Sequence, residues 1–271
     1  MDAEQRVSHG LLLHGWRSLL LFVLLACAWA VALVLGGAGL GLELGGEDLG
    51  VFDVLFSGLA SLGFVGIAVL LAGLKGRPRS LVLGLRRPVL GGLAMAFVAG
   101  MALSLFASGL AEFLSQWNPW FSDLHLSALA ALLVEGSPGS RVLTLVLVLV
   151  LAPLAEELLF RGFLWDGLQE LGGRTLALIL SSLLFAAYHG DPLHVISVLP
   201  LSFALGFLRA ATASLWSAMA AHFGNNLLAV GLVLSGIEEL SIGVAIAGGL
   251  ASLLLVVASA SFPSPLENAR E

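Results

Sequence analysis

Long uncharged runs alternate with short charged loops along most of the chain. Each run is long enough, or nearly so, to cross a bilayer as a helix, which takes about 20 apolar residues. No part of the sequence shows the repeated alternation over ~10 residues that is typical of membrane β-strands. The pattern therefore predicts an all-α, polytopic membrane bundle of about eight transmembrane helices, over roughly 18–42, 54–74, 89–111, 142–164, 176–189, 193–208, 213–237 and 240–262.

Two of these segments, 176–189 and 193–208, are shorter than a helix that spans a bilayer of about 30 Å. Tilted helices with longer boundaries would explain their length, and so would a partly re-entrant pair around Asp191 and Pro192. Variants with seven or six spans therefore stay open beside the eight-helix plan.

Composition agrees with a protein that lies mostly in membrane lipid. Hydrophobic residues make up 59% of the 271 residues and charged residues 11%, whereas an ordinary soluble domain has about 25% charged residues. The formal charge of −6 is spread over loops and forms no long run of one sign, so no nucleic-acid partner is expected. Cys27 is the only cysteine, which excludes an internal disulfide and a CxxC metal motif.

The basic residues predict the orientation of the bundle. Cytoplasmic loops of membrane proteins carry an excess of Lys and Arg. If the N-terminus is cytoplasmic, all but one of the 12 Lys and Arg residues fall on or near the cytoplasmic side, and only Arg141 falls outside. We therefore expect a multi-pass protein of the cell (inner or cytoplasmic) membrane with both termini in the cytoplasm. Its expected organisation is a two-helix segment over 1–87, a membrane core over 88–262 and a cytoplasmic tail over 263–271.

Small residues recur at every fourth position of the third predicted helix, at Gly92, Ala96 and Gly100. This spacing places them on one helix face, where small side chains let two backbones approach closely. The spacing therefore permits close helix contact, although such matches arise easily by chance in a chain with 33 glycines.

Polar residues interrupt the apolar segments in three places, and the first is Glu156, Glu157 and Arg161. Ionisable groups at membrane depth are costly to keep there and are therefore functional candidates. Residues four apart share a helix face, so Glu157 can pair with Arg161, while Glu156 projects about 100° away toward another neighbour. Taken alone, Glu157 and Arg161 are explained equally well as a structural ion pair. Pro153 removes a backbone hydrogen bond just upstream, and we expect the helix to open there and expose carbonyls or admit water.

The second and third places each contain a histidine. His222 and Asn226 lie four residues apart, hence on one helix face, and an amide inside a membrane needs partners for its donor and its acceptor. Phe185 lies one turn before His189 and is expected to wedge that ring or to wall a cavity. A lone histidine in an apolar helix is usually a packing residue, but two histidines with a carboxylate and an amide indicate a shared site. The remaining histidines are expected on solvated surface: His9, His14, His125 and His194.

Such a group of side chains could activate water in two ways. Two histidine nitrogens and a carboxylate oxygen could bind a divalent metal, with zinc the expected ion, and lower the pKa of its bound water to about 7. Alternatively, Glu156 and His189 could polarise the water directly while His222 and Asn226 donate to a developing oxyanion. The sequence leaves both routes open, and the lack of an HExxH motif excludes only the arrangement of soluble zincins.

The order EExxxR, FxxxH and HxxxN, each in a separate hydrophobic segment, resembles the CPBP intramembrane protease family, also called Abi, which includes type II CAAX prenyl endopeptidase. The matching motifs run from Glu156 to Asn226, and upstream of about Pro88 the resemblance is one of topology only. It implies that residues 88–262 are the core of a helical metalloendopeptidase that cuts peptide bonds within or beside the membrane. A metal-free glutamate mechanism has also been argued for this family, although its name describes it as metal-dependent.

The resemblance also implies roles for single residues. The essential residues would be Glu156, His189, His222 and Asn226, with Glu157, Arg161 and Phe185 in support. If a metal is bound, its ligands would be Glu156, His189 and His222.

The substrate is predicted only by class. Eleven arginines against one lysine indicate a GC-rich bacterial genome. Because bacteria generally lack protein prenylation, we expect another membrane-associated protein or peptide, in peptide maturation or in bacteriocin self-immunity. The competing hypothesis is a non-catalytic membrane scaffold or transporter that uses the buried polar cluster for docking or proton coupling. The complete set of four polar residues argues against a scaffold, and the lack of an internal repeat argues against a transporter.

Overall fold

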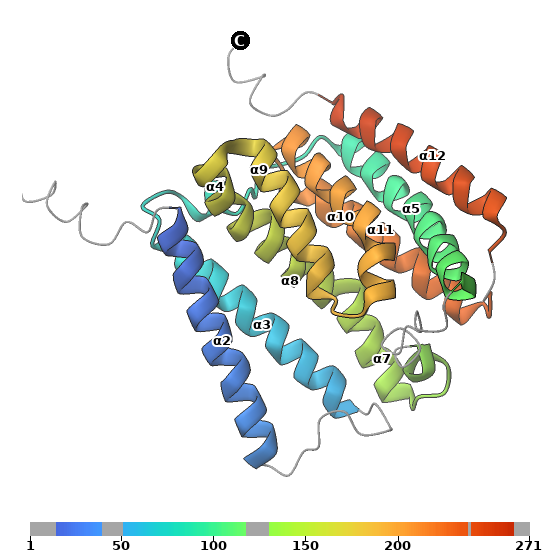
Figure 1. The fold of residues 1–271 in the computed structure, drawn as a ribbon, viewed down its shortest axis with the longest axis horizontal. Coiled ribbons are helices and arrows are strands. Elements are labelled where there is room, and N and C mark those ends of the chain that lie inside the picture. The colour runs from blue at the N-terminus through green and yellow to red at the C-terminus, as the bar shows by residue number, and fades with distance from the viewer. Residues whose placement is uncertain (1–14, 40–50, 118–129, 238–239, 263–271) are drawn as a thin grey trace, which may run out of the picture.

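The structure, a computed structural model, describes residues 15–39, 51–117, 130–237 and 240–262. In these ranges every regular element is a helix, and the long helices are arranged as a bundle (Figure 1). The all-α prediction is therefore confirmed. The elements are α2 (Trp16–Gly39), α3 (Val51–Gly73), α4 (Arg79–Val82), α5 (Leu90–Trp117), α7 (Pro138–Val146), the π-helix η1 (Leu147–Leu151), α8 (Ala152–Glu157), the π-helix η2 (Leu158–Leu164), α9 (Trp165–Tyr188), α10 (Pro192–Thr212), α11 (Leu215–Leu234) and α12 (Ile242–Ala260).

Six helical stretches among the described residues are long and apolar enough to cross a membrane. An additional apolar helix, Gly58–Gly73, is shorter. One of the six stretches, Pro138–Tyr188, is 51 residues long. At 1.5 Å per residue it would be about 75 Å if straight, more than twice the ~30 Å of a hydrocarbon core. The protein is thus a helical polytopic membrane protein, and its longest stretch must bend.

That bend lies inside α9, at Gly172 and Gly173. Gly173 has φ +79° and ψ −176°, a backbone conformation that is open almost only to glycine. The ring of Phe160 lies 5.3 Å from that of Phe185 and 5.6 Å from that of Tyr188, although 25 residues of straight helix would separate them by about 37 Å. The chain therefore folds back on itself between 164 and 176, where the hydrophobic pattern predicts a gap between two helices.

The small residues of α5 lie against α11 and α12, a close contact that their spacing permits. A Cβ atom on Gly100 would lie only 1.8 Å from the carbonyl oxygen of Ala221 in α11. At Gly92 the approach is close enough for its carbonyl to accept a hydrogen bond of 2.8 Å from the Ser259 hydroxyl of α12. In Figure 1, α5 runs alongside α12. This close contact fixes α11, which carries His222, relative to the rest of the bundle.

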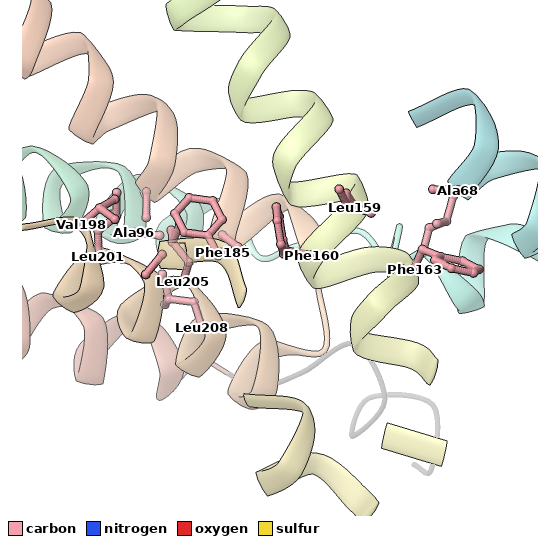
Figure 2. Close-up of a cluster of buried hydrophobic side chains, with 14 of the residues drawn as sticks. Ala68, Ala96, Leu159, Phe160, Phe163, Phe185, Val198, Leu201, Leu205 and Leu208 are labelled. Carbon is pink, nitrogen blue, oxygen red and sulfur yellow. The ribbon is translucent and has the colours of Figure 1, made fainter. Parts of the chain in front are cut away.

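Buried apolar side chains connect the middle of the bundle with the N-terminal helices (Figure 2). Phe160 of η2 makes its edge-to-face contact with Phe185 of α9 on one side. Phe163, one turn further along, contacts Phe22 of α2 at 5.5 Å and lies beside Ala68 of α3 in Figure 2. Because lipid tails are as apolar as these side chains, close packing holds such helices together, with little help from removal of water.

A charged cluster attaches the N-terminal helices to the core. Lys75 follows α3, and its fully buried side chain places Nζ 2.6 Å from Asp166 and 3.1 Å from Glu170 of α9. Arg77 pairs with the same two carboxylates but is 43% exposed. Glu170 also accepts a hydrogen bond from the backbone N–H of Gly15, at the start of α2. The sequence motifs gave no sign of these two acids, which become paired only when the helices come together.

The linker between α3 and α5 covers the same end of the bundle. The N–H of Leu215 donates to the carbonyl of Gly84, and the Ser214 hydroxyl donates to the carbonyl of Arg86, each over 2.8 Å. Gly84 has φ +69°, and a Cβ atom there would lie 2.6 Å from Nη2 of Arg209. Three segments for which the positive-inside rule predicts a cytoplasmic position therefore lie together: the α3 to α5 linker, the start of α9 and the turn between α10 and α11.

Candidate active site

Two π-helical turns interrupt the helix that carries the first motif. η1 and η2 flank α8, which is six residues long and has Pro153 in its first turn. The N–H of Ala152 bonds to the carbonyl of Leu147, five residues back. In that register the next carbonyl, of Val148, would accept from residue 153, but proline has no N–H. The backbone hydrogen bond that Pro153 cannot donate is therefore missing, and such π-helical turns are frequent at functional sites.

Glu156 and Glu157 leave α8 on different faces, as adjacent residues of a helix must. The side chain of Glu157 is fully buried, whereas that of Glu156 is 16% exposed. Glu157 is therefore enclosed by protein, and Glu156 is the carboxylate with an open side.

A network of buried hydrogen bonds fixes the side chain of Glu157. Its Oε1 accepts a hydrogen bond from Nη1 of Arg161 at 3.1 Å, which confirms the predicted pair. Arg161 is fully buried, and its Nη2 donates to the carbonyl and hydroxyl of Ser202 at 2.8 and 3.0 Å. Its guanidinium also lies over the ring of Phe185, 4.1 Å from the centroid. The first motif is thereby fixed to α9 and α10.

His222 lies between the two glutamates. Its Nδ1 is 3.0 Å from Oε1 of Glu157, and its Nε2 is 3.8 Å from Oε2 of Glu156. An ionised carboxylate only accepts hydrogen bonds, so Nδ1 carries the proton and Nε2 is directed toward Glu156. A separation of 3.8 Å is too long for a direct hydrogen bond. The imidazole and Glu156 can therefore share a third group, such as a water molecule or a substrate atom.

His189 lies in the turn after α9. Its Nδ1 is 2.9 Å from the carbonyl oxygen of Phe185, which can only accept, so Nε2 is left unprotonated. Phe185 is fully buried and packs against both catalytic candidates, with centroids 5.1 Å from His189 and 5.5 Å from His222. It thus wedges both rings, where the sequence predicted only that of His189.

Asn226 lies one turn after His222, but its amide bonds to the backbone. Nδ2 donates to the carbonyl of Val148 over 2.9 Å, and Oδ1 accepts from Nδ2 of Asn225 at 3.1 Å. Because a carbonyl only accepts, the amino end of the Asn226 amide must face Val148. The amide has a second N–H that this bond does not use.

The three predicted metal ligands are not brought together. Among the described residues, no group of three His, Cys, Asp or Glu side chains is arranged to hold a metal ion. Glu156 and His222 face each other, but His189 is turned by its bond to Phe185 and lies against the ring of His194, 4.5 Å away. The arrangement therefore supplies two of the three ligands of the predicted zinc site.

Several members of the site were not predicted from the sequence. Ser182 and Ser202 exchange two hydrogen bonds between α9 and α10, of 3.0 and 2.7 Å, and Ser202 is the partner of Arg161. Arg209 donates from Nε to the carbonyl of Arg161 at 2.9 Å. His194, expected on solvated surface, instead packs against His189. The position of these serines within apolar helices was the signal in the sequence that could have indicated them. Only the packing shows to which carbonyl each hydroxyl donates.

Residues 138–228 match the protein family described as type II CAAX prenyl endopeptidase Rce1-like. This match confirms the resemblance predicted from the three motifs, and every predicted site residue falls within it.

A relative from Bacillus subtilis (strain 168), named "Putative membrane peptidase YdiL", is 25% identical to the chain over 134 residues. The alignment covers 49% of this chain and 53% of the relative, so the chain spans about half the length of that protein. No solved structure matches the chain significantly.

Proposed function

We propose that this protein is an intramembrane endopeptidase that hydrolyses a peptide bond in a membrane-associated protein or peptide. The observation that carries the proposal is the pair formed by Glu156 and His222, with Oε2 and Nε2 3.8 Å apart. Behind the pair, Glu157 and Arg161 are fully buried and fix the imidazole through its other nitrogen. The family match over 138–228 points to the same chemistry.

In the proposed reaction Glu156 is the general base. Its carboxylate takes a proton from a water molecule, and the oxygen of that water forms a bond to the substrate carbonyl carbon. When the C–N bond breaks, the same proton passes to the leaving amine, so Glu156 returns to its starting state. Glu157 orients His222, whose Nε2 faces the reacting water, and such a carboxylate partner fixes the tautomer of a histidine.

His189 and Asn226 complete the proposed set. Nδ1 of His189 is held by the carbonyl of Phe185, so His189 can polarise water or hydrogen-bond the substrate through Nε2. Asn226 lies on the same helix face as His222 and supplies the amide of this set. No step is assigned to a metal, because the described side chains gather only Glu156 and His222 of the three predicted ligands.

The proposed membrane plan has eight spans, with both termini on the cytoplasmic side of the cell membrane. The reversal at Gly173 supports two separate spans within Pro138–Tyr188. The contacts of Lys75 with α9 and of Arg86 with Ser214 support one common side for three basic segments. Single cysteines in a Cys27→Ser background, placed at Arg79 and at Arg141, should react with a membrane-impermeant maleimide from opposite sides. Labelling of both from one side would contradict the plan.

The function itself is tested by comparing membrane proteomes. Cells with the wild-type protein and cells with Glu156→Ala are compared for peptides with new termini, and Glu135→Ala, an exposed glutamate, is the matched control. We expect at least one membrane protein or peptide to stay uncut in Glu156→Ala only. Identical sets of termini in all three strains would instead favour a non-catalytic scaffold or transporter.

A further inference from the structure

We propose that Asn226 is a positioning residue: its amide replaces the backbone donor that Pro153 lacks, and so holds η1 and α8 in the geometry that aims Glu156 at His222. This inference rests on the proposed function and specifies the role of one residue in it. It concerns the amide N–H that faces Val148, and so it is independent of the oxyanion role that the sequence left open for Asn226.

The first step of the argument concerns the backbone. Ala152 donates to Leu147, five residues back, so the helix is in π register when it reaches Pro153. The carbonyl of Val148 is next in that register, and proline has no N–H to offer it. A carbonyl without a partner is costly inside a membrane, where water is scarce. The Nδ2 of Asn226 supplies the missing donor over 2.9 Å.

The second step concerns which helices the bond connects. Asn226 and His222 lie one turn apart on α11, while Val148 and Glu157 lie on either side of Pro153. His222 bonds to Glu157 and Asn226 bonds to Val148, so two hydrogen bonds connect α11 to the interrupted helix. Glu156 lies between these two bonds in the sequence. Its direction therefore depends on both bonds.

The third step concerns orientation of the amide. Oδ1 of Asn226 accepts a hydrogen bond from Nδ2 of Asn225, which leaves Nδ2 of Asn226 toward the carbonyl of Val148. Both ends of the amide are thus engaged with protein groups. With its oxygen and one of its N–H groups held in this way, the amide has the fixed orientation that a support for η1 requires.

A double-mutant cycle in thermal stability tests the inference without any substrate. In Pro153→Ala the backbone regains an N–H, so Val148 no longer depends on Asn226. We expect Asn226→Ala to lower Tm by about 2–4 °C in the wild-type background and by clearly less in the Pro153→Ala background. Equal losses in the two backgrounds would overturn the inference.

Matched controls keep this cycle specific. Pro200 is a second proline inside a helix, in α10, and Pro200→Ala should leave the effect of Asn226→Ala unchanged. Asn226→Asp keeps the size of the side chain but removes both amide donors, so it should lower Tm as Asn226→Ala does. An unchanged Tm in Asn226→Asp would also overturn the inference.

Turnover separates positioning from simple structural support. The probe is an internally quenched peptide that carries a farnesylated cysteine before its last three residues. In the wild-type background, Asn226→Ala should lower kcat at least about 10-fold with little change in KM. In the Pro153→Ala background, the same substitution should lower kcat only slightly further. Loss of a residue that acted only as an oxyanion donor would instead lower kcat by the same factor, about 10²–10³, in both backgrounds, and this result would overturn the inference. If the wild-type protein cuts no such peptide, the proposed activity on this probe fails, and the Tm cycle still decides the role of Asn226.

Discussion

At the scale of single residues, the two adjacent glutamates of the candidate site differ in their surroundings and in their proposed roles. Glu157 is enclosed and bonded to Arg161 and His222, while Glu156 has an open side that faces His222. This difference follows from helix geometry, because neighbouring side chains point about 100° apart. One carboxylate can therefore hold the imidazole while the other reacts.

The first prediction concerns the reacting groups. We expect Glu156→Gln, His189→Ala and His222→Ala each to lower turnover by about 10²–10⁴-fold, with Tm changed little for Glu156→Gln. The losses should not add, because the three side chains act on one water molecule. Peptide cleavage and Tm of single and double mutants provide the measurement. A double mutant whose loss equals the product of the single losses would show that the residues act separately.

The second prediction concerns the buried pair. Arg161→Ala leaves the fully buried Glu157 without its cation, which should cost about 3–5 kcal/mol of stability. Glu157→Gln in the same chain should recover part of this loss, since a glutamine is neutral and its oxygen can still accept from His222. The exposed Arg141 provides the control, and Arg141→Ala should change stability by less than about 1 kcal/mol. An Arg161→Ala protein that is stable but inactive would place this arginine in substrate recognition.

The third prediction concerns metal. Because only Glu156 and His222 of the predicted ligands face each other, protein purified without a metal-binding tag should contain well below one equivalent of zinc. Elemental analysis gives the content, and peptide cleavage after chelation shows whether the metal matters. One full equivalent, lost in both His189→Ala and His222→Ala, would show that His189 moves to join the other two ligands.

At the scale of elements, close contact between α5 and α11 determines where His222 lies. Gly100 leaves no room for a side chain, since a Cβ atom would lie 1.8 Å from the backbone oxygen of Ala221, the residue before His222. A methyl group there must push the two helices apart. The geometry of the site therefore depends on a residue that takes no part in the chemistry.

The fourth prediction follows from this contact. Gly100→Ala should lower Tm and also reduce cleavage, because it displaces α11 and with it the imidazole. Gly231→Ala is the matched control on α11, since nothing lies within 4 Å of the added methyl group, and it should leave both quantities unchanged or raise Tm slightly. Normal cleavage by Gly100→Ala would show that α11 moves without disturbing His222.

At the scale of the whole molecule, the N-terminal helices are attached to the core by charge as well as by packing. Lys75 and Arg77 contact the same two carboxylates on α9, but only Lys75 is fully buried. Removal of a buried charge leaves its partners less well compensated than removal of an exposed one. The two residues therefore form a natural matched pair.

The fifth prediction uses that pair. Lys75→Met should lower stability by about 3 kcal/mol or more, whereas Arg77→Met should cost at most about 1 kcal/mol. Thermal unfolding in one detergent at one salt concentration measures both. Equal losses would indicate that the cluster is hydrated in the membrane-bound protein, and that packing alone attaches the N-terminal helices.

The sequence by itself determined the class of fold and the polar residues that are candidates for the site. Apolar runs of bilayer length require helices, since helices satisfy their own backbone hydrogen bonds within lipid. The spacing of four in the three motifs places each pair of side chains on one helix face. These are local consequences of helix geometry and of proline chemistry, so the pair of Glu157 with Arg161 and the missing backbone hydrogen bond at Pro153 could be predicted.

Only the tertiary structure decided how the motifs meet. Whether Nε2 of His222 faces Glu156 or His189, and whether the Asn226 amide faces a substrate or the carbonyl of Val148, depends on how α11 packs on α5 and α8. The same holds for the partners of Asp166, Glu170 and Ser202, which lie far away in the sequence. Contacts of this kind depend on helix rotation and on shifts of an ångström or two, which a hydrophobic pattern does not specify, because lipid tolerates any apolar face equally well.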